Sequence, residues 1–448
     1  MLNTIAIRGY RSLREVVLPL AGLTVVTGAN GTGKSSLYRA LRLLADCGRG
    51  EVIGSLAREG GLESVLWAGP EQLGGARRTG KVEGTIRTGP VSLELGFASD
   101  DFGYLVDLGL PQMAGHNSLF ALDPEIKREA VFVGRVMRTG STLVRRTRDY
   151  AEASAESGRG FDEMTRSLPP YRSVLAEYAH PGAHPELAAV RHRLRSWRFY
   201  DGFRVDAAAP SRLPHVGTRT PVLSDDGGDL AAAVQTIIEA GFNDLQRAVA
   251  DAFDGAAVSV AVRDGLFDLQ LRQHGMLRPL RAAELSDGTL RFLLWAAALL
   301  SPQPPSLMVL NEPETSLHPD LVRPLASLIR AAASQTQVVV VTHSKAMLEF
   351  LDTVSVTDAE DGVAVEIELH KKLGETRVKG LGMLTMPPWD WENGRQRSTV
   401  RPSVNFRSPK SRSIRSANSV ERRVPMAVKT WYRASGVVGA AAVLVLVG

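Results

Sequence analysis

Cysteine is almost absent from this chain of 448 residues, because Cys47 is the only one. A single cysteine excludes an intramolecular disulfide and any zinc site built from several cysteines. The N-terminal stretch MLNTIAIRGYRSL also lacks the charged-then-apolar layout of a signal peptide. We therefore expect a cytoplasmic protein in which Cys47 is a small apolar residue at the end of a helix.

Long hydrophobic runs, internal repeats and extended heptad patterns are missing too. The last apolar stretch, Gly436 to Gly448, has thirteen residues, whereas a helix needs roughly 20 to cross a bilayer. It is either a membrane anchor, an exposed apolar tail or an out-of-frame or extended C-terminus, and we favour the last. We expect neither a membrane partner nor a long coiled-coil arm.

A net positive charge is absent outside one segment. Residues Asn393 to Arg433 contain eleven Lys or Arg against one acid, Glu421. The whole chain has a net charge of +5, so residues 1–392 carry 5 minus 10, or −5. The basic balance therefore belongs to residues 392–448, predicted to be a disordered basic tail with a short apolar end. It does not indicate a broad DNA-binding surface elsewhere.

The most informative stretch runs from Leu23 to Leu44. A β-branched run, Thr24 to Thr27, leads into a glycine loop that fits G-x-x-x-x-G-K-[ST], and apolar residues at helical spacing follow. In such a loop the backbone N–H groups point at phosphate, Lys34 reaches the β- and γ-phosphates, and Ser35 ligates Mg²⁺. A chance glycine loop is the alternative. The predicted ATP-binding residues are Gly28, Asn30, Gly31, Thr32, Gly33, Lys34, Ser35 and Ser36.

Three further motifs follow in the C-terminal part. Leu285-Ser286-Asp287-Gly288 precedes an apolar segment, Leu290 to Leu300, which predicts a buried helix. A short strand, Leu307 to Leu310, leads into Asn311-Glu312-Pro313-Glu314, and a second buried strand, Val338 to Thr342, ends at His343. An acid at the end of a strand beside Mg·ATP can orient or deprotonate the attacking water, which makes Glu312 the candidate base.

The order and spacing of these motifs resemble those of the ATP-binding cassette ATPases. The segments IRGYRSL, RSWRFYD, LSDGTLRFLLW and VLNEPETSLHP are similar to the RecF and SMC-type branch, and more closely to a bacterial RecF-type group of predicted AAA ATPases. The resemblance covers roughly Met1 to Trp391. It implies an α/β P-loop NTPase with an antiparallel β subdomain and a mainly helical insertion, which hydrolyses ATP with Mg²⁺.

The resemblance also assigns roles. It implies that Glu312 is the general base and that His343 contacts the γ-phosphate. Ser286 and Gly288 would bind the nucleotide of a second subunit, which implies an ATP-dependent homodimer. Asn311 stands where the family has an Asp that holds Mg²⁺ through water. The Asn side chain keeps a hydrogen-bond acceptor but lacks the negative charge. We therefore expect slow turnover of ATP.

Other positions leave alternatives open. Residues 58–69 occupy the position of a loop that carries a functional Gln in the family, but they contain no Gln. Glu63 is the candidate that replaces it. His318 either belongs to a segment that links paired sites or caps a turn. Arg11 is a candidate for phosphate or DNA contact, or a surface charge.

Two arginine-rich segments are candidate DNA contacts. One mixes cations with aromatic residues, as nucleic-acid surfaces do, but is equally a helix with one buried face: Arg191, Arg193, Arg195 and Arg198 with Trp197, Phe199 and Tyr200. The other comprises Arg145, Arg146 and Arg148.

These observations divide the chain into four regions. Residues 1–120 form the N-terminal part of the ATPase head, with strands at 3–8 and 16–18 and an antiparallel meander over 81–108. Residues 121–250 are a mainly helical insertion that begins with a helix capped by Asp123. Residues 251–391 complete the head, with a hairpin of strands 258–263 and 267–272. The tail is 392–448.

Two functions remain after this reading. The favoured one is an ATPase that dimerises on DNA in repair, including double-strand break repair, or in other genome maintenance. The alternative is a nucleotide-gated module with little hydrolysis that controls an unidentified partner effector, for instance in phage defence. A subunit of a membrane transporter fits less well, because such subunits lack the IRGYRSL segment and the insertion.

Overall fold

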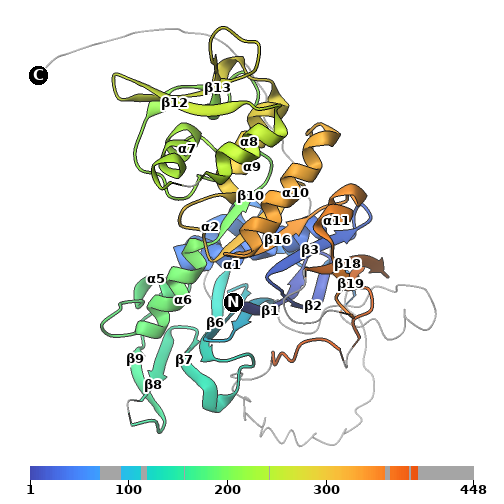
Figure 1. Ribbon diagram of the computed structural model, residues 1–448. Helices are drawn as coiled ribbons and strands as arrows, with labels where there is room; N and C mark the ends of the chain where they lie inside the picture. The colour runs from blue at the N-terminus through green and yellow to red at the C-terminus, as the bar shows by residue number, and fades with distance from the viewer. Residues whose placement is uncertain are drawn as a thin grey trace, which may run out of the picture. The chain divides into compact units, whose positions relative to one another are not determined.

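The computed structural model describes residues 1–70, 92–111, 119–155, 157–241, 243–358, 364–382 and 385–391. Within these ranges the strands form three sheets (Figure 1). The predicted tail, 392–448, and residues 81–91 of the expected meander lie outside the described residues.

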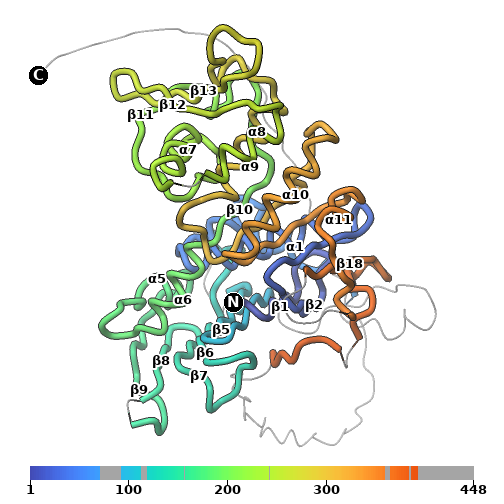
Figure 2. The backbone as a smooth tube through the Cα atoms, in the orientation of Figure 1, coloured from blue at the N-terminus to red at the C-terminus, as the bar shows by residue number. Residues whose placement is uncertain are grey.

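The central sheet carries the glycine loop. Its strands run in the order β10-β15-β16-β3-β18-β17, all parallel to their neighbours, and β19 pairs antiparallel with β18. Figure 2 shows β18, near the C-terminal end of the described chain, beside the N-terminal strands. The strands are β3 (Leu23–Gly28), β10 (Arg198–Tyr200), β15 (Leu307–Asn311), β16 (Gln337–Val341), β17 (Val354–Ser355), β18 (Val365–Lys372) and β19 (Glu375–Val378).

Both faces of this sheet are covered, which explains why β15 and β16 are continuous apolar runs. Because side chains alternate along a strand, Leu307, Val309, Val339 and Val341 pack in one core with helix α1 (Lys34–Arg49). Met308, Leu310, Val338 and Val340 pack in a second core with α9 (Asp287–Leu299) and α10 (Pro319–Ala333). Cys47 is buried in α1, as predicted.

A second, antiparallel sheet has the order β2-β1-β4-β5-β6-β7-β8-β9. It contains β1 (Leu2–Tyr10), β2 (Leu13–Pro19), β4 (Leu93–Ser99), β5 (Phe102–Gly109), β6 (Glu125–Val133), β7 (Thr142–Thr147), β8 (Tyr150–Ser154) and β9 (Phe161–Thr165). The strands expected at 3–8 and 16–18 are confirmed, as is the described half of the meander.

The predicted helix after Asp123 is wrong. Residues 125–133 form β6, which pairs with β5 and β7, so the first part of the expected helical insertion belongs to the antiparallel sheet. The prediction rested on Asp123 as a helix cap followed by Pro124, and the segment after them contains Arg128 and Glu129. In the structure both are buried, and cross-strand partners compensate their charges, since Arg128 pairs with Glu94 and Glu129 with Arg146.

Helices predominate in the later part of the expected insertion, and a small sheet forms mainly from the residues that follow it. The helices are α5 (Val174–Glu177), α6 (Pro185–Ser196), α7 (Leu230–Glu239) and α8 (Asp244–Ala252). The small sheet comprises β11 (His215–Val216), β12 (Ala257–Arg263), β13 (Leu266–Arg272) and β14 (Leu280–Arg281). The hairpin expected between β12 and β13 is confirmed, and Asp264 and Gly265 both have positive φ at its turn.

Three short helices complete the described chain, α2 (Val52–Arg58), α3 (Leu62–Val65) and α11 (Lys345–Leu351). Among the described residues, no helix combines the length and the apolar character that a membrane crossing requires.

Candidate functional site

The glycine loop connects β3 to α1 and needs glycine for two reasons. Gly28, Gly31 and Gly33 have φ values of 141°, 77° and 110°, in the region that favours glycine. A Cβ on Gly28 would lie 2.4 Å from the Leu369 carbonyl oxygen, and one on Gly33 would lie 2.3 Å from Thr376 Oγ1. The loop therefore packs against β18 and β19 too closely for any side chain at these two positions.

Hydrogen bonds hold this loop from inside and outside. Lys34 is buried, and its Nζ donates to the carbonyl oxygens of Gly28 and Ala29 at 2.6 and 3.2 Å. From β19 the Thr376 hydroxyl donates to the Thr32 carbonyl oxygen at 2.6 Å and also contacts the Ser12 hydroxyl. The lysine thus lies across the loop at the first residue of α1.

A cavity of about 1020 Å³ opens over the loop. Loop residues line it, together with a segment at 64–70, residues 371–374 and Glu312. The loop contributes Asn30, Gly31, Gly33, Lys34, Ser35 and Ser36. Six of the eight predicted ATP-binding loop residues and the predicted base therefore share one cavity, whereas Gly28 and Thr32 are not among its lining residues.

The segment at the position of the family's Gln loop also lines this cavity, but not through Glu63, the residue expected there. Ser64 and Trp67 line it, and the Trp67 indole N–H donates to the Pro70 carbonyl oxygen at 3.1 Å. Glu63 is exposed on α3 and is not among the lining residues. The structure thus gives no support to Glu63 as the substitute for Gln.

Glu312 and His343 meet at the ends of two neighbouring strands. Because β15 and β16 pair in parallel, the residues that follow them lie side by side, and Glu312 Oε1 is 3.2 Å from His343 Nδ1. Both side chains are partly exposed, at 38% and 55%. Glu312 has a φ of 47°, a conformation that few non-glycine residues adopt outside functional sites.

Glu314 lies behind this pair. One of its carboxylate oxygens accepts a hydrogen bond from the Thr342 hydroxyl, while Oε2 is buried with no hydrogen-bond partner among the described residues. This contact joins the loop after β15 to the end of β16, and so it supports the positions of Glu312 and His343.

Asn311, the residue that departs from the family motif, has a charged neighbour that sequence reasoning missed. Its amide nitrogen donates to Asp201 Oδ1 at 2.6 Å. Asp201 directly follows β10, the strand beside β15. An acid at the end of a short strand was visible in RSWRFYD, but strand order alone brings it to Asn311.

Ser286 and Gly288 lie at the start of α9, outside the residues that line the nucleotide-site cavity of their own chain. Ser286 is exposed and caps the helix by accepting from the Thr289 N–H at 3.2 Å. An ion pair of 2.6 Å between Asp287 and Arg212 fixes the turn, and a Cβ on Gly288 would meet only open space. A helix N-terminus thus faces outward, available to anions.

The structure also shows the surroundings of His318 and Arg11, for which the sequence left two roles open. His318 caps α10 and accepts from the Asp320 N–H, which agrees with the capping role. Arg11 lines the nucleotide-site cavity, where it forms a 2.7 Å ion pair with Glu59.

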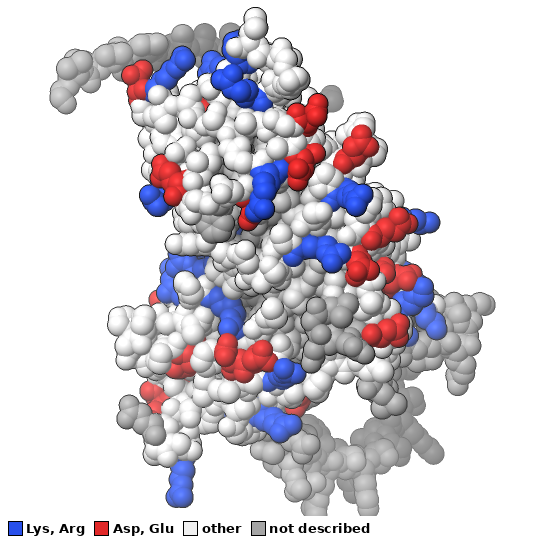
Figure 3. Space-filling view, in the orientation of Figure 1, with Lys and Arg blue, Asp and Glu red and all other residues white. Residues whose placement is uncertain are grey.

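The two arginine-rich segments differ in what they present to solvent. In the first, Arg191, Arg195 and Arg198 line a cavity together with Arg49, Asp225 and Asp226. Trp197, Phe199 and Tyr200 are buried, so they cannot stack on bases. Arg146 is fully buried against Glu129, and Arg145 pairs with Glu152. On the face shown in Figure 3, acidic and basic side chains alternate without a broad area of one sign.

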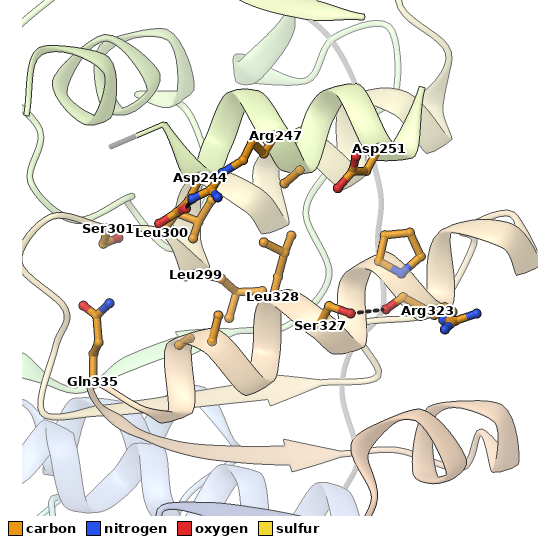
Figure 4. Close-up of a pocket in the computed structure, with 14 residues that line it drawn as sticks. Asp244, Arg247, Asp251, Leu299, Leu300, Ser301, Arg323, Ser327, Leu328 and Gln335 are labelled. Carbon is orange, nitrogen blue, oxygen red and sulfur yellow. Dashed lines mark hydrogen bonds and ion pairs between the residues drawn. The ribbon is translucent and has the colours of Figure 1, made fainter. Parts of the chain in front are cut away.

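A separate cavity of about 460 Å³ lies between α8 and α10, with the end of α9 at its side (Figure 4). Leu299, Leu300 and Leu328 form its apolar wall, and Asp244, Arg247 and Arg323 stand around it. None of the predicted site residues lines it.

A glycine loop between a parallel strand and a helix, with Glu312 of a neighbouring strand end at the same cavity and His343 in contact with it, defines a P-loop ATPase of mixed α/β fold with an antiparallel β subdomain. The chain belongs to the family described as "AAA domain, putative AbiEii toxin, Type IV TA system", whose model matches residues 23–130 and 156–349. A comparison with curated proteins finds no match.

Similar solved structures include heads of SMC proteins, as the sequence motifs predicted. An Smc head bound to the C-terminal winged-helix domain of ScpA is 14% identical, with 85% of this chain and 98% of that chain covered and a TM-score of 0.45. The SMC head domain from Thermotoga maritima is 14% identical, with coverages of 85% and 99% and a TM-score of 0.41. These TM-scores are low, and we draw nothing about activity or partners from them.

Proposed function

We propose that this chain binds Mg·ATP in the loop from Gly28 to Ser36 and hydrolyses it. The observation that carries the proposal is the single cavity in which Lys34 and Ser35 stand with Glu312, itself in contact with His343. The site fits the nucleotide, because the glycines leave backbone N–H groups unobstructed at a helix N-terminus. It fits the metal, because hydroxyl, amide and carboxylate oxygens are ligands that Mg²⁺ accepts.

Each residue then has a distinct task. Lys34 neutralises phosphate charge, and Ser35 ligates Mg²⁺, with Asn311 accepting from its water shell. Glu312 orients or deprotonates the attacking water, and His343 contacts the γ-phosphate as it takes up charge. The 3.2 Å contact between Glu312 Oε1 and His343 Nδ1 supports this division, because it holds the histidine beside Glu312, which lines the cavity.

The site is completed by a second copy of the chain. Ser286 is exposed and Gly288 half-buried at the N-terminus of α9, and neither lines the cavity of its own chain, as expected of residues that bind the nucleotide of a partner. ATP would then lie between two subunits, and hydrolysis would release them.

Glu312→Gln tests the whole scheme. The variant keeps the shape of Glu312 and loses the base, so we expect ATP hydrolysis to fall by about 10²–10⁴-fold while ATP binding remains. In light scattering it should become dimeric with ATP and Mg²⁺, and Lys34→Ala should stay monomeric. A Glu312→Gln protein that remains monomeric at saturating Mg·ATP contradicts the dimer.

A second candidate function is nucleotide-gated control of a partner effector. The family description, which refers to a putative toxin of a toxin–antitoxin system, favours it over DNA repair. Two observations agree with this second candidate function. Acidic and basic side chains alternate on the face shown in Figure 3, and the aromatic residues near Arg198 are buried.

Turnover with and without DNA separates the two candidates. An ATPase that works on DNA should be stimulated by single-stranded or duplex DNA, and the stimulation should fall steeply between two salt concentrations. Turnover indistinguishable from that of Lys34→Ala under every condition would favour the gated module.

A further inference from the structure

The contact between Asn311 and Asp201 follows from strand register. In the parallel pair of β10 and β15, Tyr200 is opposite Leu310, so the next residue of each strand emerges at the same level. The Asn311 amide nitrogen lies 2.6 Å from Asp201 Oδ1. This juxtaposition is set by the sheet, although 110 positions separate the two residues in the sequence.

The chemistry of the pair fixes the orientation of the amide. A carboxylate only accepts hydrogen bonds, so the nitrogen of the Asn311 side chain must face Asp201. Its oxygen, on the other branch of the planar amide, must then point away from Asp201. Asn311 is thus held as an acceptor, which is the property that an Asp at this position would offer to a metal-bound water.

Asp201 lies on the side of the sheet that carries α1. It lines a cavity of about 310 Å³ together with Tyr38 and Arg39 of that helix. Burial and, second, the charge of Asp201 raise the pKa of the Tyr38 hydroxyl above its usual range. Tyr38 stands one turn after Ser35, the proposed Mg²⁺ ligand, so the carboxylate is on the same side of the sheet as the metal site.

We propose that Asp201 is a positioning residue for Mg²⁺, supplying through Asn311 the negative charge that the motif itself lacks. Asp201 orients the Asn311 amide toward the water shell of the metal and raises the electron density on its oxygen. Outer partners of this kind change metal affinity by about 10–100-fold. The inference rests on the proposed Mg·ATP site and deepens it.

A purely structural role is the competing explanation, in which the hydrogen bond only tethers β10 to β15. Asp201→Asn separates the two roles, because the new amide oxygen can still accept from Asn311 and so preserves the tether. The substitution removes the charge. Because the amide nitrogen of the new Asn can donate a hydrogen bond, it also permits the Asn311 side-chain amide to flip, so that the Asn311 oxygen faces position 201.

The experiment measures the affinity of a fluorescent ATP analogue for the full chain, once in EDTA and once in Mg²⁺. The ratio of the two dissociation constants reports the contribution of the metal without any need for turnover. For Asp201→Asn we expect this ratio to fall by about tenfold or more, with the thermal midpoint unchanged. Adding Asn311→Asp to Asp201→Asn restores a carboxylate–amide pair with exchanged positions, and should recover most of the ratio.

Asp206→Asn is the matched control. Asp206 is exposed, follows the same strand and pairs with Arg204 rather than with Asn311, so its loss should leave the ratio unchanged. An unchanged ratio in Asp201→Asn overturns the inference while the Mg·ATP site stands. The inference is also overturned if the ratio of the double variant is no higher than the ratio of Asp201→Asn. If the wild-type chain binds the analogue no better than Lys34→Ala does, the proposed function fails as well.

Discussion

Arg146 offers a sharp test of how the antiparallel sheet is stabilised. Its side chain is fully buried, and one guanidinium nitrogen donates to Glu129 Oε2 at 2.9 Å. Three more of its five N–H groups donate to the carbonyl oxygens of Arg148, Arg172 and Pro169. A fully buried arginine with four donors used inside the protein cannot reach a DNA phosphate, so its substitution should affect stability first.

The size of the effect follows from what Arg146→Met leaves behind. Removing one partner of a buried ion pair costs about 3–5 kcal/mol, because the other charge loses its compensation. Glu129 would keep the hydrogen bonds from Tyr104, Ser173 and the Val174 N–H, which places the expected loss near 3 kcal/mol, the lower end of that range.

Urea denaturation followed by tryptophan fluorescence measures this loss. Arg145→Met is the matched control on the same strand, since Arg145 is 39% exposed and pairs with Glu152, and its substitution should cost at most about 1 kcal/mol. In Arg146→Met combined with Glu129→Gln no buried charge is left alone, so this double variant should be more stable than Arg146→Met. Equal costs for Arg145→Met and Arg146→Met, or strict additivity in the double variant, would refute the reasoning.

Two further substitutions test the loop and the end of the described chain. Gly33→Ala should abolish binding of a fluorescent ATP analogue, because the φ of Gly33 is 110° and the new Cβ would lie 2.3 Å from Thr376 Oγ1. Gly31→Ala is the control and should retain measurable binding, because its Cβ would meet nothing within 4 Å. Trp391→Ala should lower the free energy of unfolding by about 3 kcal/mol, because the residue is 6% exposed and packs in a hydrophobic cluster on the antiparallel sheet. Met386→Ala, at a side chain that is 37% exposed, is its control, and a change above about 0.5 kcal/mol there would argue against the packing explanation.

The parts of the site that could be predicted are those encoded within a short stretch of sequence. The glycine loop needs only a strand, a helix and fixed spacing, and the structure has all three. The placing of Glu312 and His343 at strand ends also followed from the sequence, since two apolar runs of four residues each, Leu307 to Leu310 and Val338 to Val341, mark their strands. Their mutual contact follows because neighbouring parallel strands end at the same edge.

The parts that could not be predicted depend on pairing between distant segments. Thr376 supports the glycine loop from β19, more than 300 positions away, and no local pattern marks it. Burial of Arg128 and Glu129 in β6 requires partners on other strands, which the local capping signal at Asp123 could not reveal. Arg146 was expected on a surface for the same reason.

The order of the strands suggests how to interpret the departure at position 311. In the order β10-β15-β16 three strand ends lie in a row, bearing Asp201, Asn311 with Glu312, and His343. Neighbouring strands are only about 4.8 Å apart, so a charge moved from one strand end to the next stays within reach of the same metal. Judged alone, Asn311 indicates a weakened site. Judged with its neighbour, it is one half of an amide–carboxylate pair, and the charge that the motif lacks lies one strand away.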